Sequence, residues 1–193
     1  MMAPDRSAGV TFPGLRGNVL EALETGDILQ ECRVVSSKPA EYRYQWLGPD
    51  GNPISNTAFL QKDYVLRPQD EGIYTCLATP TQNGLLPVES SLIVTITPLR
   101  FTINTVAEDL KVGGFTRRRI SLIPPNGAHL NTRETFTYQW LSPDGAPIPQ
   151  GTGPDMHVTF RSPQDFGRYY VQVRGLNSGY KRDLISYITL DGE

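Results

Sequence analysis

The sequence has little of what catalysis and metal binding usually need. It contains two Cys and two His in 193 residues, too few thiols for a zinc site of four thiolates or for a cysteine-rich scaffold. No motif places His129 or His157 beside a nucleophile or a catalytic carboxylate, so the commonest proton carrier of enzymes lacks partners. These shortages favour a binding or structural protein over an enzyme, with no cofactor and no metal.

Long apolar runs and a strong charge of one sign are also missing. No run of about 18 apolar residues occurs, so nothing in this sequence is expected to insert into a membrane. The formal net charge of −2 gives no electrostatic case for binding nucleic acid, which usually needs a strongly basic domain.

Turn-forming residues, in contrast, are abundant. The chain has 18 Gly and 16 Pro, and no convincing helical periodicity over ten residues or more. Short alternating stretches lie between the turn signals: Tyr42–Trp46, Tyr64–Leu66, and Ile73–Ala78 with Tyr74, Cys76 and Ala78 facing inward. This pattern predicts an all-β protein built as a sandwich.

The chain repeats itself. Tyr44–Ile54 recurs 94 residues later as Tyr138–Ile148, and Pro68–Tyr74 recurs 95 residues later as Pro163–Tyr169. Two blocks in the same order at nearly one spacing predict two copies of one domain, 1–98 and 99–193, joined by a short linker. The first copy has 7 basic and 11 acidic residues and the second 11 and 9, so their net charges are −4 and +2.

The spacing of Cys32, Trp46 and Cys76, with Asp-x-Gly-x-Tyr before the second cysteine, resembles the immunoglobulin superfamily. The resemblance implies two tandem immunoglobulin-like β-sandwiches of I type. In the first, it implies that Cys32 and Cys76 bridge the two sheets, that Trp46 packs on the bridge, and that Tyr74 forms the tyrosine corner.

The second copy departs from this pattern because it has no cysteine. Counting from the motifs places Ile120 and Val171 at the two cysteine positions, whereas Trp140 and the tyrosine-corner residue Tyr169 remain. We expect Ile120 and Val171 to offset part of the missing bridge by packing on Trp140. A connection at Pro124–Thr132 is six residues longer than its counterpart in the first copy.

The cysteines and the N-terminus bear on the cellular compartment of the protein. A buried bridge persists in an oxidising compartment, which favours an extracellular protein, whereas two reduced cysteines would indicate an intracellular immunoglobulin domain. Met1–Ser7 has no apolar segment of a signal peptide, so we expect either an intracellular chain or a piece of a longer secreted or cell-surface protein.

Basic residues of the second copy form the strongest candidate site. On a strand, Arg117 and Arg119 point the same way and Arg118 the other. Their guanidinium groups suit the sulfates and carboxylates of a glycosaminoglycan. A second basic spot flanks a hairpin tip and consists of Arg174, Lys181 and Arg182. The family topology puts the two spots on different sheets, and the alternative is a solvated strand edge that blocks unwanted pairing.

Three further features of the sequence bear on function. Leu85 and Leu86, beside the hairpin signal Asn83-Gly84, offer an apolar contact for a protein partner, or fold back over the end of the sandwich. Asp70 and Asp165 sit at equivalent positions of separate domains, so they are not expected to share an active site. Gly113-Gly114 is expected to be a turn and not a phosphate loop.

The function predicted from these features is non-enzymatic recognition or adhesion. The Tyr-Gln-Trp-Leu-x-Pro-Asp-Gly-x-Pro-Ile stretch resembles the arrays of extracellular matrix proteoglycans such as perlecan, and of adhesion receptors. This resemblance implies a module that binds a protein partner, with glycosaminoglycan bound by the second domain. The alternatives are an intracellular cytoskeletal scaffold and a soluble decoy or receptor.

Overall fold

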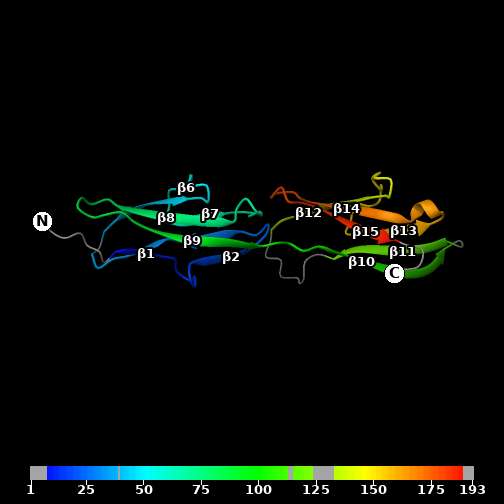
Figure 1. The fold of residues 1–193 in the computed structure, drawn as a ribbon, viewed down its shortest axis with the longest axis horizontal. Coiled ribbons are helices and arrows are strands. Elements are labelled where there is room, and N and C mark those ends of the chain that lie inside the picture. Colours follow the sequence, from blue (N-terminus) through cyan, green and yellow to red (C-terminus); the bar gives the residue numbers. More distant parts are fainter. Residues whose placement is uncertain (1–7, 39, 113–114, 124–132, 189–193) are drawn as a thin grey trace. The chain divides into compact units, whose positions relative to one another are not determined.

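The computed structural model describes residues 8–38, 40–112, 115–123 and 133–188 (Figure 1). The chain divides into two compact units, Met1–Pro98 (unit 1) and Leu99–Glu193 (unit 2). Among the described residues the only helix is the short 3₁₀ turn η1, Pro163–Asp165. Outside the described residues lie Met1–Ser7, Gly113-Gly114, where the sequence predicts a turn, and Pro124–Thr132 with His129.

Nine strands are described in unit 1. They are β1 (Gly9–Thr11), β2 (Val19–Leu23), β3 (Ile28–Glu31), β4 (Arg33–Val35), β5 (Tyr42–Leu47), β6 (Pro53–Ser55), β7 (Phe59–Lys62), β8 (Gly72–Pro80) and β9 (Val88–Thr97). The larger sheet has the order β2-β9-β8-β5-β6, in which β2 runs parallel to β9 and the other neighbours are antiparallel. Two antiparallel pairs, β3-β7 and β1-β4, complete the unit.

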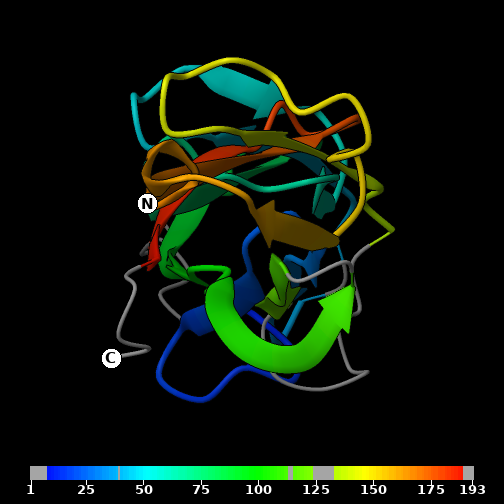
Figure 2. The ribbon, with the colours of Figure 1, turned by 90° about the vertical axis from the view of Figure 1, so that its right-hand side faces the viewer.

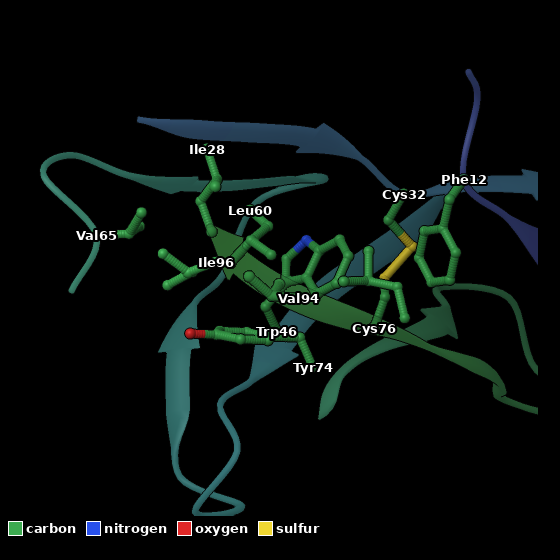
Figure 3. Packing of buried hydrophobic residues seen from close by; sticks show 11 residues of the cluster. Phe12, Ile28, Cys32, Trp46, Leu60, Val65, Tyr74, Cys76, Val94 and Ile96 are labelled. Atoms are coloured by element: carbon green, nitrogen blue, oxygen red, sulfur yellow. A yellow bond between two sulfur atoms is a disulfide. The ribbon is translucent and has the colours of Figure 1, made fainter. Parts of the chain in front are cut away.

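The core of unit 1 lies between these sheets (Figure 3). Tyr74, Cys76 and Ala78 on β8 are all buried, which confirms the predicted inward parity of this strand. Trp46 on β5 is fully buried and is the register partner of Cys76. Side chains from β3 and β7 meet this layer from the other side, so the two layers share one apolar core.

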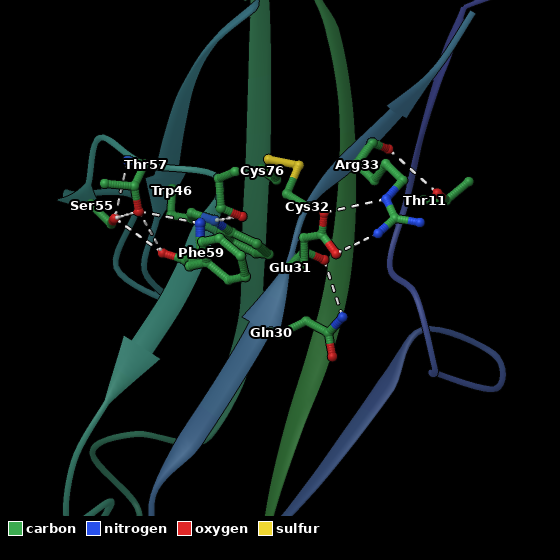
Figure 4. Close-up of a disulfide and its surroundings, with 11 residues drawn as sticks. Thr11, Gln30, Glu31, Cys32, Arg33, Trp46, Ser55, Thr57, Phe59 and Cys76 are labelled. Carbon is green, nitrogen blue, oxygen red and sulfur yellow. Dashed lines mark hydrogen bonds and ion pairs between the residues drawn. A yellow bond between two sulfur atoms is a disulfide. The ribbon is translucent and has the colours of Figure 1, made fainter.

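A disulfide joins Cys32, between β3 and β4, to Cys76 on β8, with 6.5 Å between the Cα atoms (Figure 4). The bridge therefore connects the two layers, as the resemblance implied. Trp46 lies beside it, and the indole N–H donates to the Ala58 carbonyl at 3.4 Å. The buried indole thus keeps a hydrogen-bond partner inside the core.

One predicted strand was wrong. The sequence favoured a strand at Tyr64–Leu66, but the strand that pairs with β3 is β7, Phe59–Lys62. Tyr64 has φ 54°, in the left-handed region, which ends the extended run before this residue. Val65 is buried in the core from an irregular segment.

The two repeated sequence blocks of each unit meet in space. Gly72 has φ 135°, and a Cβ at this position would lie 2.9 Å from Cβ of Pro49 in the Pro-Asp-Gly turn. Gly167 has φ 137°, and its Cβ would lie 3.3 Å from Cβ of Pro143. Only glycine both adopts this backbone angle easily and leaves room for the proline ring of the turn. This contact explains why the Pro-Asp-Gly turn and the Asp-x-Gly-x-Tyr motif occur together in each unit.

Unit 2 forms two three-stranded sheets, which can be followed from a second direction in Figure 2. The first has the order β10-β11-β13 and the second β12-β14-β15. Their strands are β10 (Thr102–Val112), β11 (Phe115–Ile123), β12 (Phe136–Leu141), β13 (Asp155–Phe160), β14 (Gly167–Gly175) and β15 (Lys181–Ile188). All pairs in these sheets are antiparallel.

The core of unit 2 surrounds Trp140, which is fully buried. Its register partner is Val171, just as Cys76 is the partner of Trp46 in unit 1. Ile120 on β11 is also fully buried, so apolar side chains occupy the region that the disulfide fills in unit 1. The indole N–H of Trp140 donates to the Gly153 carbonyl at 3.0 Å.

Both units contain the tyrosine corner. The hydroxyl of Tyr74 donates to the Asp70 carbonyl at 3.0 Å, and that of Tyr169 to the Asp165 carbonyl at 2.7 Å. Burial first, and then the negative charge of the nearby Asp, raises the pKa of each tyrosine to about 12. The Asp165 carboxylate accepts the backbone N–H of Arg161 at 2.7 Å, which lowers its pKa. The motif therefore fixes the turn before β14.

Candidate functional site

The basic run of unit 2 lies on β11, in the sheet β10-β11-β13. Ile120 and Leu122 are buried, so the alternation of a strand places Arg118 on the core side and Arg117 and Arg119 on the outer face. The Arg118 guanidinium lies over the Phe160 ring, 5.6 Å from the ring centre. Arg118 is therefore held as a cation–π partner, whereas Arg117 and Arg119 face outward.

Strand pairing brings a third basic side chain to the outer face. His157 on β13 is the register partner of Arg119, and Thr159 is the partner of Arg117. His157 is exposed, and the two arginines are half-buried. A depression of about 250 Å³, here called the β11–β13 pocket, is lined by Arg117, Ile148, Gln150, Asp155, Met156, His157 and Thr159.

The pocket is lined by charged groups of both signs. Among the described residues, Arg117 has no ion-pair partner, and Asp155 is the acidic residue of the lining. Glu108 on β10 is the register partner of Arg117. A guanidinium beside hydroxyl, amide and imidazole groups can bind a carboxylate or sulfate through paired N–H donors.

The second predicted basic spot lies in the other sheet of unit 2. Arg174 on β14 is the register partner of Lys181 on β15. Its Nη1 donates to the Asp183 carboxylate at 2.7 Å and to the Arg182 carbonyl at 3.2 Å. The Arg174 guanidinium is thus engaged within its own sheet, and Lys181 and Arg182 remain exposed. The structure does not bring these residues onto the sheet of Arg117 and Arg119.

The two leucines of unit 1 lie in the connection between β8 and β9. Leu86 is 62% exposed, whereas Leu85 is half-buried. Of the two leucines, Leu86 is therefore the one that is mostly exposed to solvent.

Of the residues that line the β11–β13 pocket, sequence reasoning proposed only Arg117 as a site residue and missed the other six, among them Gln150, His157 and Thr159. A signal for two of them was present, because Met156, Val158 and Phe160 alternate with His157 and Thr159. Met156, Val158 and Phe160 are buried and face the core, so the alternation places His157 and Thr159 on the outer face of β13. Which strand lies beside β13, and in which register, could not be read from this pattern.

A buried carboxylate organises the β14–β15 hairpin. Glu134 accepts the backbone N–H groups of Thr135 at 2.8 Å, Asn177 at 3.0 Å and Ser178 at 2.6 Å. Burial alone would raise the pKa of Glu134, but hydrogen bonds from Ser178, Asn177 and Thr135 lower it to about 2. The carboxylate therefore acts as a clamp on the hairpin backbone.

Loss of this clamp is expected to destabilise unit 2. Glu134→Ala removes the charged acceptor of three partly buried N–H donors, at a cost of about 2 kcal/mol in the free energy of unfolding. Because the folded pKa is lowered, the contribution of Glu134 is complete above the unfolded pKa of about 4.3 and is lost as pH falls towards 2. Urea titrations at pH 7 and pH 3 measure both effects. The variant should unfold earlier at pH 7 and lose less stability on acidification; equal acid sensitivity of both proteins would contradict the clamp.

Metal sites and membrane-spanning helices are features of other functional classes. No group of three or more His, Cys, Asp or Glu that could hold a metal ion occurs among the described residues. In the same part of the chain, no helix is long and apolar enough to cross a membrane.

The two facing layers, the disulfide between them beside Trp46, and the tyrosine corners together define an immunoglobulin-like β-sandwich. The all-β prediction and the predicted immunoglobulin fold are confirmed.

Solved structures with this fold resemble the chain at low identity. Three N-terminal domains of the highly immunogenic outer capsid protein (Hoc) of bacteriophage RB49 are 16% identical, with a TM-score of 0.51 over 95% of this chain and 58% of that one. The eight N-terminal Ig domains of Down syndrome cell adhesion molecule are 15% identical, with a TM-score of 0.43 over 95% and 27%. The amphioxus IgVJ-C2 molecule is 16% identical, with a TM-score of 0.35 over 89% and 100%. No family model and no curated protein matches the chain.

Proposed function

We propose that this chain is a non-enzymatic recognition or adhesion module of an extracellular matrix or cell-surface protein. In this proposal it binds a protein partner, and unit 2 binds an anionic polysaccharide of the glycosaminoglycan type. The observation that carries the polysaccharide part is the β11–β13 pocket, where Arg117 faces outward beside His157. A guanidinium held on a sheet can pair a sulfate or carboxylate with little further ordering.

The disulfide supports the extracellular setting. Cys32 and Cys76 are buried and bridged in the core of unit 1, and such bridges persist where the environment is oxidising. The alternative of an intracellular scaffold requires the same two residues to be reduced. Leu86 is the residue we propose for a protein contact, because its side chain is 62% exposed at a hairpin.

Chromatography on immobilised heparin tests the polysaccharide part. We expect the chain to elute above physiological salt, about 0.15 M. Arg117→Ala should weaken binding by about five- to tenfold, since one charge-assisted pair is lost. Arg174→Ala is the matched control, because this guanidinium already binds Asp183, and its effect should be smaller. Elution below physiological salt, or a larger loss for Arg174→Ala than for Arg117→Ala, would contradict the assignment.

A further inference from the structure

We propose that the chain binds a second copy of itself. The contact joins the outer face of β14 and β15 in unit 2 of one copy (the unit 2 face) to the outer face of β2, β9 and β8 in unit 1 of the other (the unit 1 face). This inference rests on the part of the proposed function in which the chain binds a protein, and it specifies that partner. It makes no use of the β11–β13 pocket.

The unit 2 face presents aromatic and aliphatic side chains to solvent. Burial of alternate residues on β14 and β15 leaves Tyr170, Ile185 and Tyr187 on the outer side of the sheet. Tyr187 is 62% exposed and Ile185 48%, and Ile185 is the register partner of Tyr170. Arg168 is the register partner of Tyr187 and lies over its ring, so this contact restricts both side chains before a partner binds. Ordered Tyr and Arg side chains are those that most often dominate the free energy of protein association.

The unit 1 face carries an aliphatic row. Val19 on β2, Ile93 on β9 and Ile73 on β8 are neighbours in register across three strands. Ile73 is 57% exposed and Ile93 46%, and Val19 is half-buried. Exposed apolar side chains that stand together in this way are typical of a protein-binding surface.

The charges on the two faces have opposite signs. The charged residues of β2, β8 and β9 are Glu21 and Glu89, and both are exposed. The unit 2 face has three cations and one carboxylate, which are Arg168, Arg174, Lys181 and Asp183. Within the part of the chain that the structure describes, neither the two glutamates nor Arg168 and Lys181 have an ion-pair partner. A second copy supplies these partners, because its basic face meets the acidic one.

The spacing of the charges also matches. Glu21 is the register partner of Thr95, which lies six residues from Glu89 on β9. Arg168 and Arg174 are likewise six residues apart on β14. A strand rises about 3.4 Å per residue, so about 20 Å separates the two charged positions on each face. Apolar side chains lie between these positions in both units, so apolar and ionic contacts can form at the same time.

Sedimentation equilibrium of the full chain over a range of concentrations tests the inference. We expect the average mass to rise with concentration, with half-association at about 10–100 μM, which is usual for a small, partly polar interface. Tyr187→Ala should weaken the association about tenfold, since it removes the aromatic side chain at the centre of the contact. The mass of a monomer at every concentration would overturn the inference.

Charge reversal distinguishes this contact from other modes of self-association. One variant reverses the unit 2 face, Arg168→Glu/Lys181→Glu, and another reverses the unit 1 face, Glu21→Lys/Glu89→Lys. Each alone should associate at least about tenfold more weakly, because like charges then meet. An equimolar mixture of the two variants should regain the affinity of the unmodified chain, because each reversed face then meets a face of opposite charge. Unchanged association of either variant alone, or a mixture that stays monomeric, would contradict the contact.

The matched control is Arg100→Glu/Arg182→Glu, which changes the net charge of unit 2 by the same amount. Both arginines are exposed, and strand alternation places Arg182 on the opposite side of β15 from Lys181. We expect this variant to change the affinity by less than about twofold, the effect of a remote exposed charge. A loss as large as that of Arg168→Glu/Lys181→Glu would show that net charge, and not the unit 2 face, controls the association. Near-UV circular dichroism of each variant verifies that the fold is retained.

The outcomes separate this inference from the proposed function. A chain that stays monomeric but binds another protein overturns the inference and leaves the proposed protein recognition standing. A chain that associates as described but fails to bind heparin supports the inference, and only the polysaccharide part of the proposed function then fails.

Discussion

Reduction of the Cys32–Cys76 disulfide is expected to lower the melting temperature of unit 1 and to leave that of unit 2 unchanged. The bridge closes a loop of 44 residues, and removing such a constraint on the unfolded chain costs about 4 kcal/mol. For a domain of this size, that loss corresponds to a fall of at least about 10 °C. Unit 2 contains no cysteine, so a reductant has no bond to break there. Differential scanning calorimetry with and without reductant measures the shift.

The variant Cys32→Ala/Cys76→Ala is the control, because it removes the bridge without a reductant. It should reproduce the shifted transition, and adding reductant should have no further effect on it. Equal shifts of every transition, or no shift at all, would contradict a bridge that stabilises unit 1 alone.

Substitution of Trp140 by Ala is expected to unfold unit 2. The side chain is fully buried and its N–H binds a backbone carbonyl, so truncation leaves a large cavity at a cost of about 3–5 kcal/mol. No disulfide limits the unfolded state of this unit. Because each unit has one Trp, the remaining Trp46 fluorescence reports on unit 1 alone and should keep its buried emission. Hydrogen exchange of the β14 and β15 amides reports the loss in unit 2.

Tyr187→Ala provides the matched comparison for this experiment. Its side chain is 62% exposed on β15, where Arg168 lies over the ring at 5.3 Å. We expect a change of no more than about 1 kcal/mol, the value of an exposed cation–π contact. Protection of the β14 and β15 amides that survives Trp140→Ala would show that the core of unit 2 does not depend on the indole.

Those parts of the fold that depend on local sequence could be predicted. The inward parity of Tyr74, Cys76 and Ala78 follows from strict alternation, and Trp46 from its spacing to the cysteines. The same alternation wrongly predicted a strand at Tyr64–Leu66. Tyr64 has a positive φ in the folded chain, and no Gly or Asn at this position indicates it in the sequence.

The candidate site was predicted only in part, because strand register is a non-local property. Arg117 and Arg119 were identified from their charge and spacing on one strand. His157 lies about 40 residues further along the chain, and its place opposite Arg119 depends on how β13 pairs with β11. The same limit applies to Arg174. Its guanidinium binds Asp183 across β14 and β15, and this pairing could not be read from the sequence.

The central proposal is that the outer face of β11 and β13 is a recognition surface for an anionic polysaccharide. A backbone amide NMR titration with a heparin tetrasaccharide tests it most directly. The account predicts that the largest chemical-shift changes occur at Arg117–Arg119 and Asp155–Thr159. Changes confined to β14 and β15, changes confined to unit 1, or no changes at saturating ligand would contradict it.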